Sequence, residues 1–248
     1  MRRLNFLAML LLLLTALAQA AEPDKMSQAD ALLQSPSLNF RMAQQALTLY
    51  TDCLSAGGAG VTLLPRLARA CFICGDLAPK KPRAGYYEKG LAYAERLLQE
   101  QSDGVAGHYW KALNLCGLAD VGGRFHGFRL LPRILEELKE SLALDETYDQ
   151  AGAHRVLGRI YYEAPPWPIS VGDRKKSMQH LTTAVRLAPD NSTNHLYLAE
   201  TLLDLKKTVQ AKEELEKVLQ PGQNALHPQA LAEDRREARR LLQEMKQG

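Results

Sequence analysis

The sequence lacks a marked excess of charge of either sign. It contains 31 Lys and Arg against 28 Asp and Glu, and removal of a leader holding Arg2 and Arg3 leaves 29 against 28. A net charge of about +1 cannot neutralise a row of phosphates. Nucleic acid is therefore excluded as an expected partner.

The chain also lacks an apolar run long enough to span a membrane as a helix. The run Leu4–Leu17 is shorter than the roughly 20 residues that a span needs. It follows two Arg residues and precedes Ala18-Gln19-Ala20, which is the order of a secretory signal peptide, so we predict cleavage after Ala20. A periplasmic or secreted protein with no membrane span after cleavage is expected. The alternative is an uncleaved anchor, and no Cys follows the cleavage site to carry a lipid.

Patterns that carry catalysis or metal binding are missing as well. The six His residues show no HExxH or comparable ligand spacing, and no Ser, His and Asp grouping can be assembled. The glycine-rich stretch Gly122–Gly127 follows a predicted helix rather than a strand and lacks the Gly-Lys-Ser/Thr ending of a phosphate loop. We assign no catalytic residue, no metal and no cofactor, and we do not expect an enzyme.

Cysteine is scarce, with four residues at positions 53, 71, 74 and 116. Cys71 and Cys74 form a Cys-x-x-Cys pair, but Gly75–Pro79 indicates that the pair closes a helix, whereas redox pairs usually open one. A disulfide from Cys74 or Cys71 to Cys116 is our preferred hypothesis in an oxidising compartment, and buried free thiols are the alternative. Cys53 is expected to lie too far away to join.

No sustained alternation of apolar and polar residues indicates strands, whereas apolar residues recur at helical spacing throughout. The last third carries a repeat: Leu198, Ala199 and Leu202 in one helix match the first-helix positions of the tetratricopeptide pattern. The second-helix positions are filled by Ala211, Leu215 and Val218. One repeat earlier, Leu157-Gly158 takes the same place, and the spacing of 41 residues to Leu198 implies an inserted loop at Ala164–Ser170. Small residues such as Gly158 are expected to pack where paired helices cross.

These patterns predict an all-α fold of antiparallel helix pairs, stacked as a right-handed tetratricopeptide-like α-solenoid with a C-terminal capping helix. We expect one helical-repeat domain over residues 21–248. Its predicted units span approximately residues 61–100, 105–145, 150–189 and 193–221, and the cap spans 228–246.

The stretches Tyr109–Leu115 and Val156–Tyr162, with Pro165-Pro166-Trp167-Pro168, resemble the T-component family of TRAP transporters. The resemblance covers roughly Tyr109 to Leu219. It implies a helical tetratricopeptide-type protein of the cell envelope that associates with the solute-binding protein of an uptake system. The helical pattern also resembles eukaryotic regulators of microtubule dynamics, and the predicted signal peptide argues against that interpretation.

First helices of such pairs line the concave face, so their outward residues are candidates for contact with a partner. In the third and fourth units these are Arg155, Arg159, Tyr162, Glu163, Leu196, Glu200, Leu203 and Asp204. Arg155 and Arg159 share one helical face and could hold a carboxylate of a peptide or of an acidic solute, or they could simply be exposed and pair with Glu163 or other carboxylates. Trp167 could anchor a partner at the groove mouth, or it could pack back onto Tyr161 or Trp110.

The leading functional hypothesis is an adaptor that binds a protein partner, namely a TRAP solute-binding protein. A direct carrier of an apolar or anionic small molecule is the second hypothesis, and a general envelope-assembly scaffold is the third.

Overall fold

The structure, a computed structural model, describes residues 24–247. The predicted signal peptide, residues 1–20, lies outside this part of the chain. Residues 24–247 form helices and no strand, apart from two isolated bridges between Pro166 and Gly172 and between Asn191 and Asn224. The all-α prediction is confirmed.

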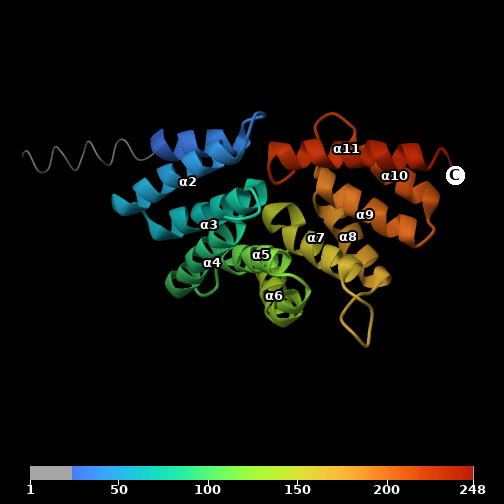
Figure 1. Cartoon of the computed structure of the whole chain (residues 1–248), viewed down its shortest axis with the longest axis horizontal. Coiled ribbons are helices and arrows are strands. Elements are labelled where there is room, and N and C mark those ends of the chain that lie inside the picture. The colour runs from blue at the N-terminus through green and yellow to red at the C-terminus, as the bar shows by residue number, and fades with distance from the viewer. Residues whose placement is uncertain (1–23, 248) are drawn as a thin grey trace, which may run out of the picture.

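The helices follow one another with short connections (Figure 1). They are residues 24–34, α2 (Phe40–Ser55), α3 (Gly60–Leu77), α4 (Arg83–Glu100), α5 (Val105–Gly122), α6 (Arg124–Leu144), α7 (Tyr148–Glu163), α8 (Arg174–Leu187), α9 (Ser192–Asp204), α10 (Thr208–Val218) and α11 (Pro228–Glu244). The helix at 24–34 was not predicted. It places Ala29 and Leu33 in the first core cluster.

Polar side chains at the helix starts accept hydrogen bonds from backbone N–H groups that have no partner inside the helix. Asn39 accepts one from Met42 at 3.2 Å, and Asp173 accepts two, from Lys175 and Lys176, at 2.9 and 3.1 Å. The same type of cap begins α9 at Asn191 and α11 at His227. Each such cap contributes about 1 kcal/mol and fixes where the helix begins.

Successive helices pack in pairs, most extensively α3 with α4, α5 with α6, α7 with α8, and α9 with α10. Small residues allow the close crossings. A Cβ at Gly158 would lie 2.5 Å from Cγ of Leu181, so only glycine fits where α7 crosses α8. Ala199 and Ala211 are fully buried at the crossing of α9 and α10. The prediction that these small residues serve packing is confirmed.

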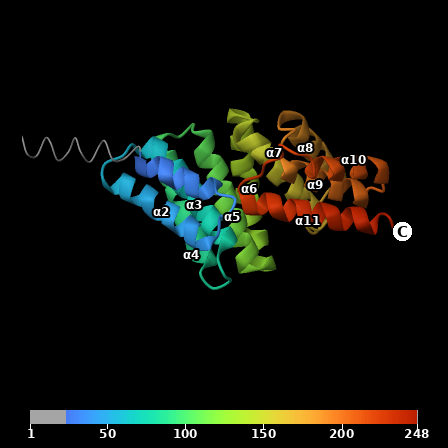
Figure 2. The same cartoon turned by 90° about the horizontal axis from the view of Figure 1, so that it is seen from above.

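Helix α11 packs on α9 and α10, with Ala238 and Leu241 against Leu196 and Leu215. Its first turn also reaches the opposite end of the stack, next to the N-terminal helices (Figures 1 and 2). Gln229 Nε2 donates to the carbonyl of Leu38 at 2.7 Å. The helix is thus more than a terminal cap, because it bridges the two ends of the curved stack.

A further property concerns membranes. Over residues 24–247, none of the helices combines the length and the apolar character that crossing a bilayer requires.

Candidate functional site

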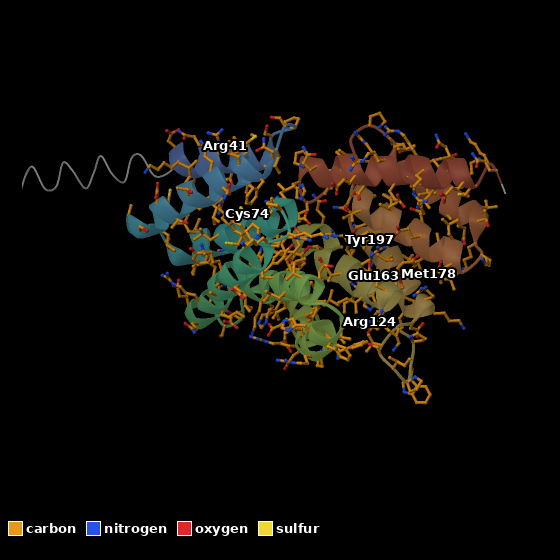
Figure 3. All side chains as sticks on the ribbon, in the orientation of Figure 1. Arg41, Cys74, Arg124, Glu163, Met178 and Tyr197 are labelled. Carbon is orange, nitrogen blue, oxygen red and sulfur yellow. The ribbon has the colours of Figure 1, made fainter. Side chains whose placement is uncertain are left out.

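A groove of about 810 Å³ lies between the concave side of the stack and the first turns of α11. Its floor is apolar and comes from α5, α6 and α7: Leu113, Phe128, Leu131, Ile134, Val156 and Ile160. Its border carries charges of both signs from four helices: Asp76, Arg124, Arg159, Glu163, Glu233 and Asp234. Figure 3 shows Arg124, Glu163 and Tyr197 of this border, which come from α6, α7 and α9. The groove brings apolar and charged groups from sequence-distant helices together in one surface.

Arg155 lies at the inner end of this groove, but its guanidinium is fully engaged inside the protein. It donates to Asp149 Oδ2 at 2.9 Å, to the Tyr109 hydroxyl at 3.1 Å and to Asn194 Oδ1 at 3.3 Å. The residue is only 7% exposed. Burial alone would lower the pKa of Arg155, but Tyr109 and Asp149 raise it above its ordinary value. The prediction of an exposed Arg155 on the concave face is therefore wrong.

The same guanidinium holds an unusual turn at the start of α7. Asp149, Gln150 and Ala151 have φ values of 48°, 59° and 60°, in the left-handed region that residues other than glycine rarely adopt. Arg155 donates to the carbonyls of Asp149 and Gln150 at 3.3 and 3.2 Å, and Asn194 donates to the carbonyl of Gln150 at 3.3 Å. These contacts stabilise a backbone conformation that would otherwise be strained.

Arg159, one turn further along α7, borders the groove and is half-buried. It pairs with Glu163 at 2.6 Å and with Glu200, and its guanidinium stacks on the Tyr197 ring at 4.4 Å. Burial raises the pKa of Glu200, an effect that Arg159 partly offsets. The pairing with Glu163, one of the two interpretations considered for the sequence, is thus present. Arg159 is thus ordered at the groove border by Glu163, Glu200 and Tyr197, whereas Arg155 is almost entirely buried.

The remaining predicted residues of α7 and α9 are distributed differently from the expectation. Tyr162 is stacked on Arg174 at 4.2 Å, and Asp204 pairs with the same Arg174 at 2.7 Å, so both lie away from the groove. Leu203 is partly buried against the core of the last helices. Leu196 is 5% exposed and covered by α11, so its prediction as a surface contact is wrong. The sequence could not show that α11 folds back over this face.

Trp167 is 85% exposed at the tip of the connection between α7 and α8. It does not cover the core as the packing interpretation required, and the buried Trp110 instead donates to the Tyr148 hydroxyl at 3.0 Å. The base of the connection, at Pro165 and Ser170, borders the groove mouth. The role of Trp167 as an anchor for a partner remains a prediction.

The predicted staple between Cys74 and Cys116 is not formed, because Cys71, Cys74 and Cys116 are free thiols in the structure. The Tyr87 ring fills the space between α3 and α5, where a Cβ at either neighbouring glycine, Gly75 or Gly117, would collide with it. Cys74 is buried in the core of the first helices, whereas Cys116 borders the groove. Burial raises the pKa of Cys74 and of Cys116 to about 12.

Sequence reasoning missed the contributions of α6 and α11 to the groove. Asp234 of α11 accepts hydrogen bonds from Ser192 at 2.6 Å and from Thr193 at 2.7 Å, and it is 7% exposed. The charged sequence of α11 predicts a solvent-exposed capping helix, so the burial of the Asp234 carboxylate could not be inferred from it. No local pattern indicated which helix it would meet. Over residues 24–247, no group of three or more His, Cys, Asp or Glu is placed to hold a metal ion.

Comparisons with known proteins identify the family. The family model described as "Regulator of microtubule dynamics protein 1-3" matches residues 25–167, which is more than half of the chain. The chain belongs to this family. A tetratricopeptide repeat model matches residues 169–234. The predicted signal peptide was therefore wrongly taken as evidence against membership of this family.

A solved structure shares the fold. A thermophilic tetratricopeptide-repeat protein from Thermus thermophilus superposes with a TM-score of 0.61 at 21% identity, covering 79% of this chain and 89% of that protein. A comparison with curated proteins gave no match. These findings establish a tetratricopeptide-like solenoid, a fold typical of non-catalytic scaffolds for protein interactions. These comparisons show the tetratricopeptide-like fold, and they do not show membership of the TRAP T-component family.

Proposed function

We propose that the protein is an exported helical-repeat adaptor that binds an extended segment of a protein partner in the groove. The observation that carries the proposal is the groove itself, with an apolar floor from three helices and a border of both charge signs. Interfaces of this kind join an apolar centre to a polar rim. Arg159 supports the proposal further, since its side chain is already ordered by Glu163 and Tyr197 before any partner binds.

The partner that we propose is the solute-binding protein of a TRAP-type uptake system. Its support is the resemblance of Tyr109–Leu115 and Val156–Tyr162, together with the predicted signal peptide, which would direct the chain to the periplasm. The family is named for regulators of microtubule dynamics. This family name makes tubulin the competing partner. Export would separate the chain from microtubules and would therefore disfavour tubulin.

Affinity capture with the chain from residue 21 onward tests the proposal. The bait is exposed to a native envelope extract and, separately, to purified tubulin. A groove variant, Leu131→Asp, should lose the solute-binding protein, whereas Leu144→Asp, an exposed position at the end of the same helix, should retain it. Capture of tubulin alone, or equal capture by both variants, would contradict the proposal. Recovery of assembly factors that lose binding in Leu131→Asp would instead indicate a general envelope scaffold.

A second candidate function, direct carriage of an apolar or anionic small molecule, is favoured by the size of the groove. Its volume of about 810 Å³ falls within the roughly 300–1,000 Å³ that is typical of small-molecule sites. Arg124 and Arg159 at its border could pair with an anionic head group while the floor covers an apolar body. Native mass spectrometry of the purified protein distinguishes the two functions. A co-purified molecule that is lost in Leu131→Asp would favour the carrier.

A further inference from the structure

The charges that the groove offers to a partner are mostly negative. Five carboxylates and three arginines line it. Two of these side chains are buried and bonded inside the protein: Arg155 pairs with Asp149, and Asp234 accepts hydrogen bonds from Ser192 and Thr193. Four carboxylates and two arginines remain for contact with an occupant.

The four remaining carboxylates are accessible to solvent. They are Asp76, Asp120, Glu163 and Glu233, and their side chains are 42%, 69%, 59% and 65% exposed. They belong to α3, α5, α7 and α11 respectively, so each of these four helices presents one acidic group to the groove. A segment that lies in the groove can therefore reach them.

The existing ion pairs of these carboxylates are weak where the cation comes from outside the groove. Asp120 lies 3.6 Å from Arg83, and Glu233 lies 3.6 Å from Arg236. Neither arginine lines the groove. Exposed pairs of this kind contribute little to stability, so a cation on a partner can compete with them.

The two remaining arginines do not balance the carboxylates. Arg159 is already shared between Glu163 and Glu200. Arg124 is exposed and forms no ion pair within residues 24–247. An occupant therefore meets an excess of negative charge, which attracts cations and repels anions.

Apolar and charged side chains alternate along the same surface. On α7, Val156, Arg159, Ile160 and Glu163 all line the groove, and Leu131 lines it from α6. The three apolar side chains are only partly buried, so they leave apolar area that an occupant can cover. A complementary segment must carry apolar groups and cations close together.

We propose that the groove binds a partner segment in which Lys or Arg residues are interleaved with apolar residues. The inference rests on the proposed function, because it specifies the chemistry of the partner segment. The apolar residues bury against the floor, and the cations pair with the acidic border. The same charges disfavour an anionic small molecule as the occupant.

Synthetic peptides of about eight residues, ~26 Å long when extended, test the proposal. The probe alternates leucine and lysine, and its counterparts carry glutamate in place of lysine or serine in place of leucine. Fluorescence anisotropy measures their binding to the chain from residue 21 onward. We expect the leucine–lysine peptide to bind most tightly, and more weakly as the salt rises from about 0.01 M to about 0.15 M. Equal or tighter binding of the glutamate peptide, or no binding of the leucine–lysine peptide, would overturn the proposal.

Variants that remove one acidic group assign the interaction to the groove. Glu233→Gln and Asp120→Asn should each weaken the leucine–lysine peptide by about twofold to fivefold, as expected for exposed ion pairs. Glu216→Gln on α10 is the matched control, because Glu216 is 55% exposed, lies 3.7 Å from Lys212 and does not line the groove. It should bind as the parent does.

Arg124→Gln provides a test in the opposite direction. It removes the exposed cation of the groove border and should strengthen the leucine–lysine peptide by about twofold to fivefold. A gain of affinity cannot arise from a loss of folding. Equal affinities of Arg124→Gln, Glu233→Gln and Glu216→Gln would show that the charges of the groove do not select the occupant.

The capture experiment with Leu131→Asp decides the proposed function separately. If that variant loses the solute-binding protein while the lysine and glutamate peptides bind the parent equally, the proposed function stands and the charge preference is wrong. If Leu131→Asp retains the captured partner, the proposed function fails and the inference fails with it, because the groove is then not the site of the partner.

Discussion

His227 and Asp76, 151 residues apart in the sequence, are joined by a hydrogen bond of 3.0 Å from Nε2 of the imidazole to the carboxylate. The other imidazole nitrogen, Nδ1, accepts from the N–H of Ala230 at 3.1 Å and caps α11. One side chain thus both begins α11 and attaches it to α3. The closed arrangement of the stack therefore has a specific point of attachment at this residue.

The first prediction concerns this attachment. His227→Ala should reduce the free energy of unfolding by about 1–2 kcal/mol, because the cap and the contact with Asp76 are lost together. Amide hydrogen exchange of residues 229–234 should become faster than in the parent. Asp52→Ala, an exposed acidic position in α2, serves as the control. Unchanged exchange in the His227 variant would show that α11 is held by other contacts.

A second prediction distinguishes a structural role of Arg155 from a ligand-binding role. Arg155→Ala should reduce the free energy of unfolding by about 3–5 kcal/mol, because Asp149 and the turn carbonyls lose their donor. Urea denaturation measures the loss. Arg159→Ala should cost less, since its side chain remains 29% exposed. If the Arg155 variant kept its stability and lost only partner binding, the structural assignment would be incorrect.

The third prediction tests the covering of α9 by α11. Leu196→Ala should reduce the free energy of unfolding by about 2–4 kcal/mol, as expected for a leucine buried in a core. Leu203→Ala, on the same helix but only partly buried, should have a smaller effect in the same urea titration. Equal effects of the two substitutions would mean that α11 does not cover Leu196.

The fold could be predicted because its determinants are local. The Leu157-Gly158 and Leu198-Ala199 pairs identify first helices, and the small residue of each pair fixes a crossing that is visible within one repeat. The connection at Ala164–Ser170 likewise follows from a spacing that exceeds the repeat period. These patterns can be recognised in the sequence because each repeat packs mainly against its sequence neighbours.

The site could not be predicted to the same extent, because it depends on contacts between distant segments. Nothing near His227 indicates that it meets Asp76, and nothing in the charged pattern of α11 indicates that Asp234 is buried against Ser192. The turn at 149–151 is a further case, since none of its residues is a glycine. Arg155 was misplaced for this reason: its partners belong to a turn that local preferences disfavour.

The fourth prediction concerns the thiols. Mass spectrometric mapping of the unreduced protein should find Cys71, Cys74 and Cys116 as free thiols. Burial raises the pKa of Cys74 and Cys116 to about 12, so little reactive thiolate exists near neutral pH. Alkylation should therefore be slow in the native protein and fast in urea. Detection of a peptide pair linked through Cys74 and Cys116 would contradict the structure.

The fifth prediction follows from two histidines that meet between α7 and α8. The Nδ1 atoms of His154 and His180 lie 2.9 Å apart, and the His180 ring is stacked on Tyr161 at 5.6 Å. One Nδ1 atom must donate and the other must accept, so the two Nδ1 atoms cannot both carry a proton. Burial, followed by His154 and Lys176, lowers the pKa of His180 to about 4, and burial also lowers the pKa of His154, although Glu146 opposes this.

Because an exposed histidine has a pKa of about 6.5, the unfolded chain binds more protons than the folded chain between about pH 6.5 and pH 4. Stability should therefore fall as the pH decreases through this window, whereas above it the pair contributes no pH dependence. His180→Phe keeps the stacking on Tyr161 and removes the titrating group. On acidification, this variant should lose about 1–2 kcal/mol less of its free energy of unfolding than the parent loses, after allowance for partial exposure of the ring. Urea titrations at both ends of the window measure the difference, with His126→Phe as the control for loss of a histidine elsewhere. If the His180 and His126 variants lose the same stability on acidification, the contact between the two imidazoles is not the source of the pH dependence.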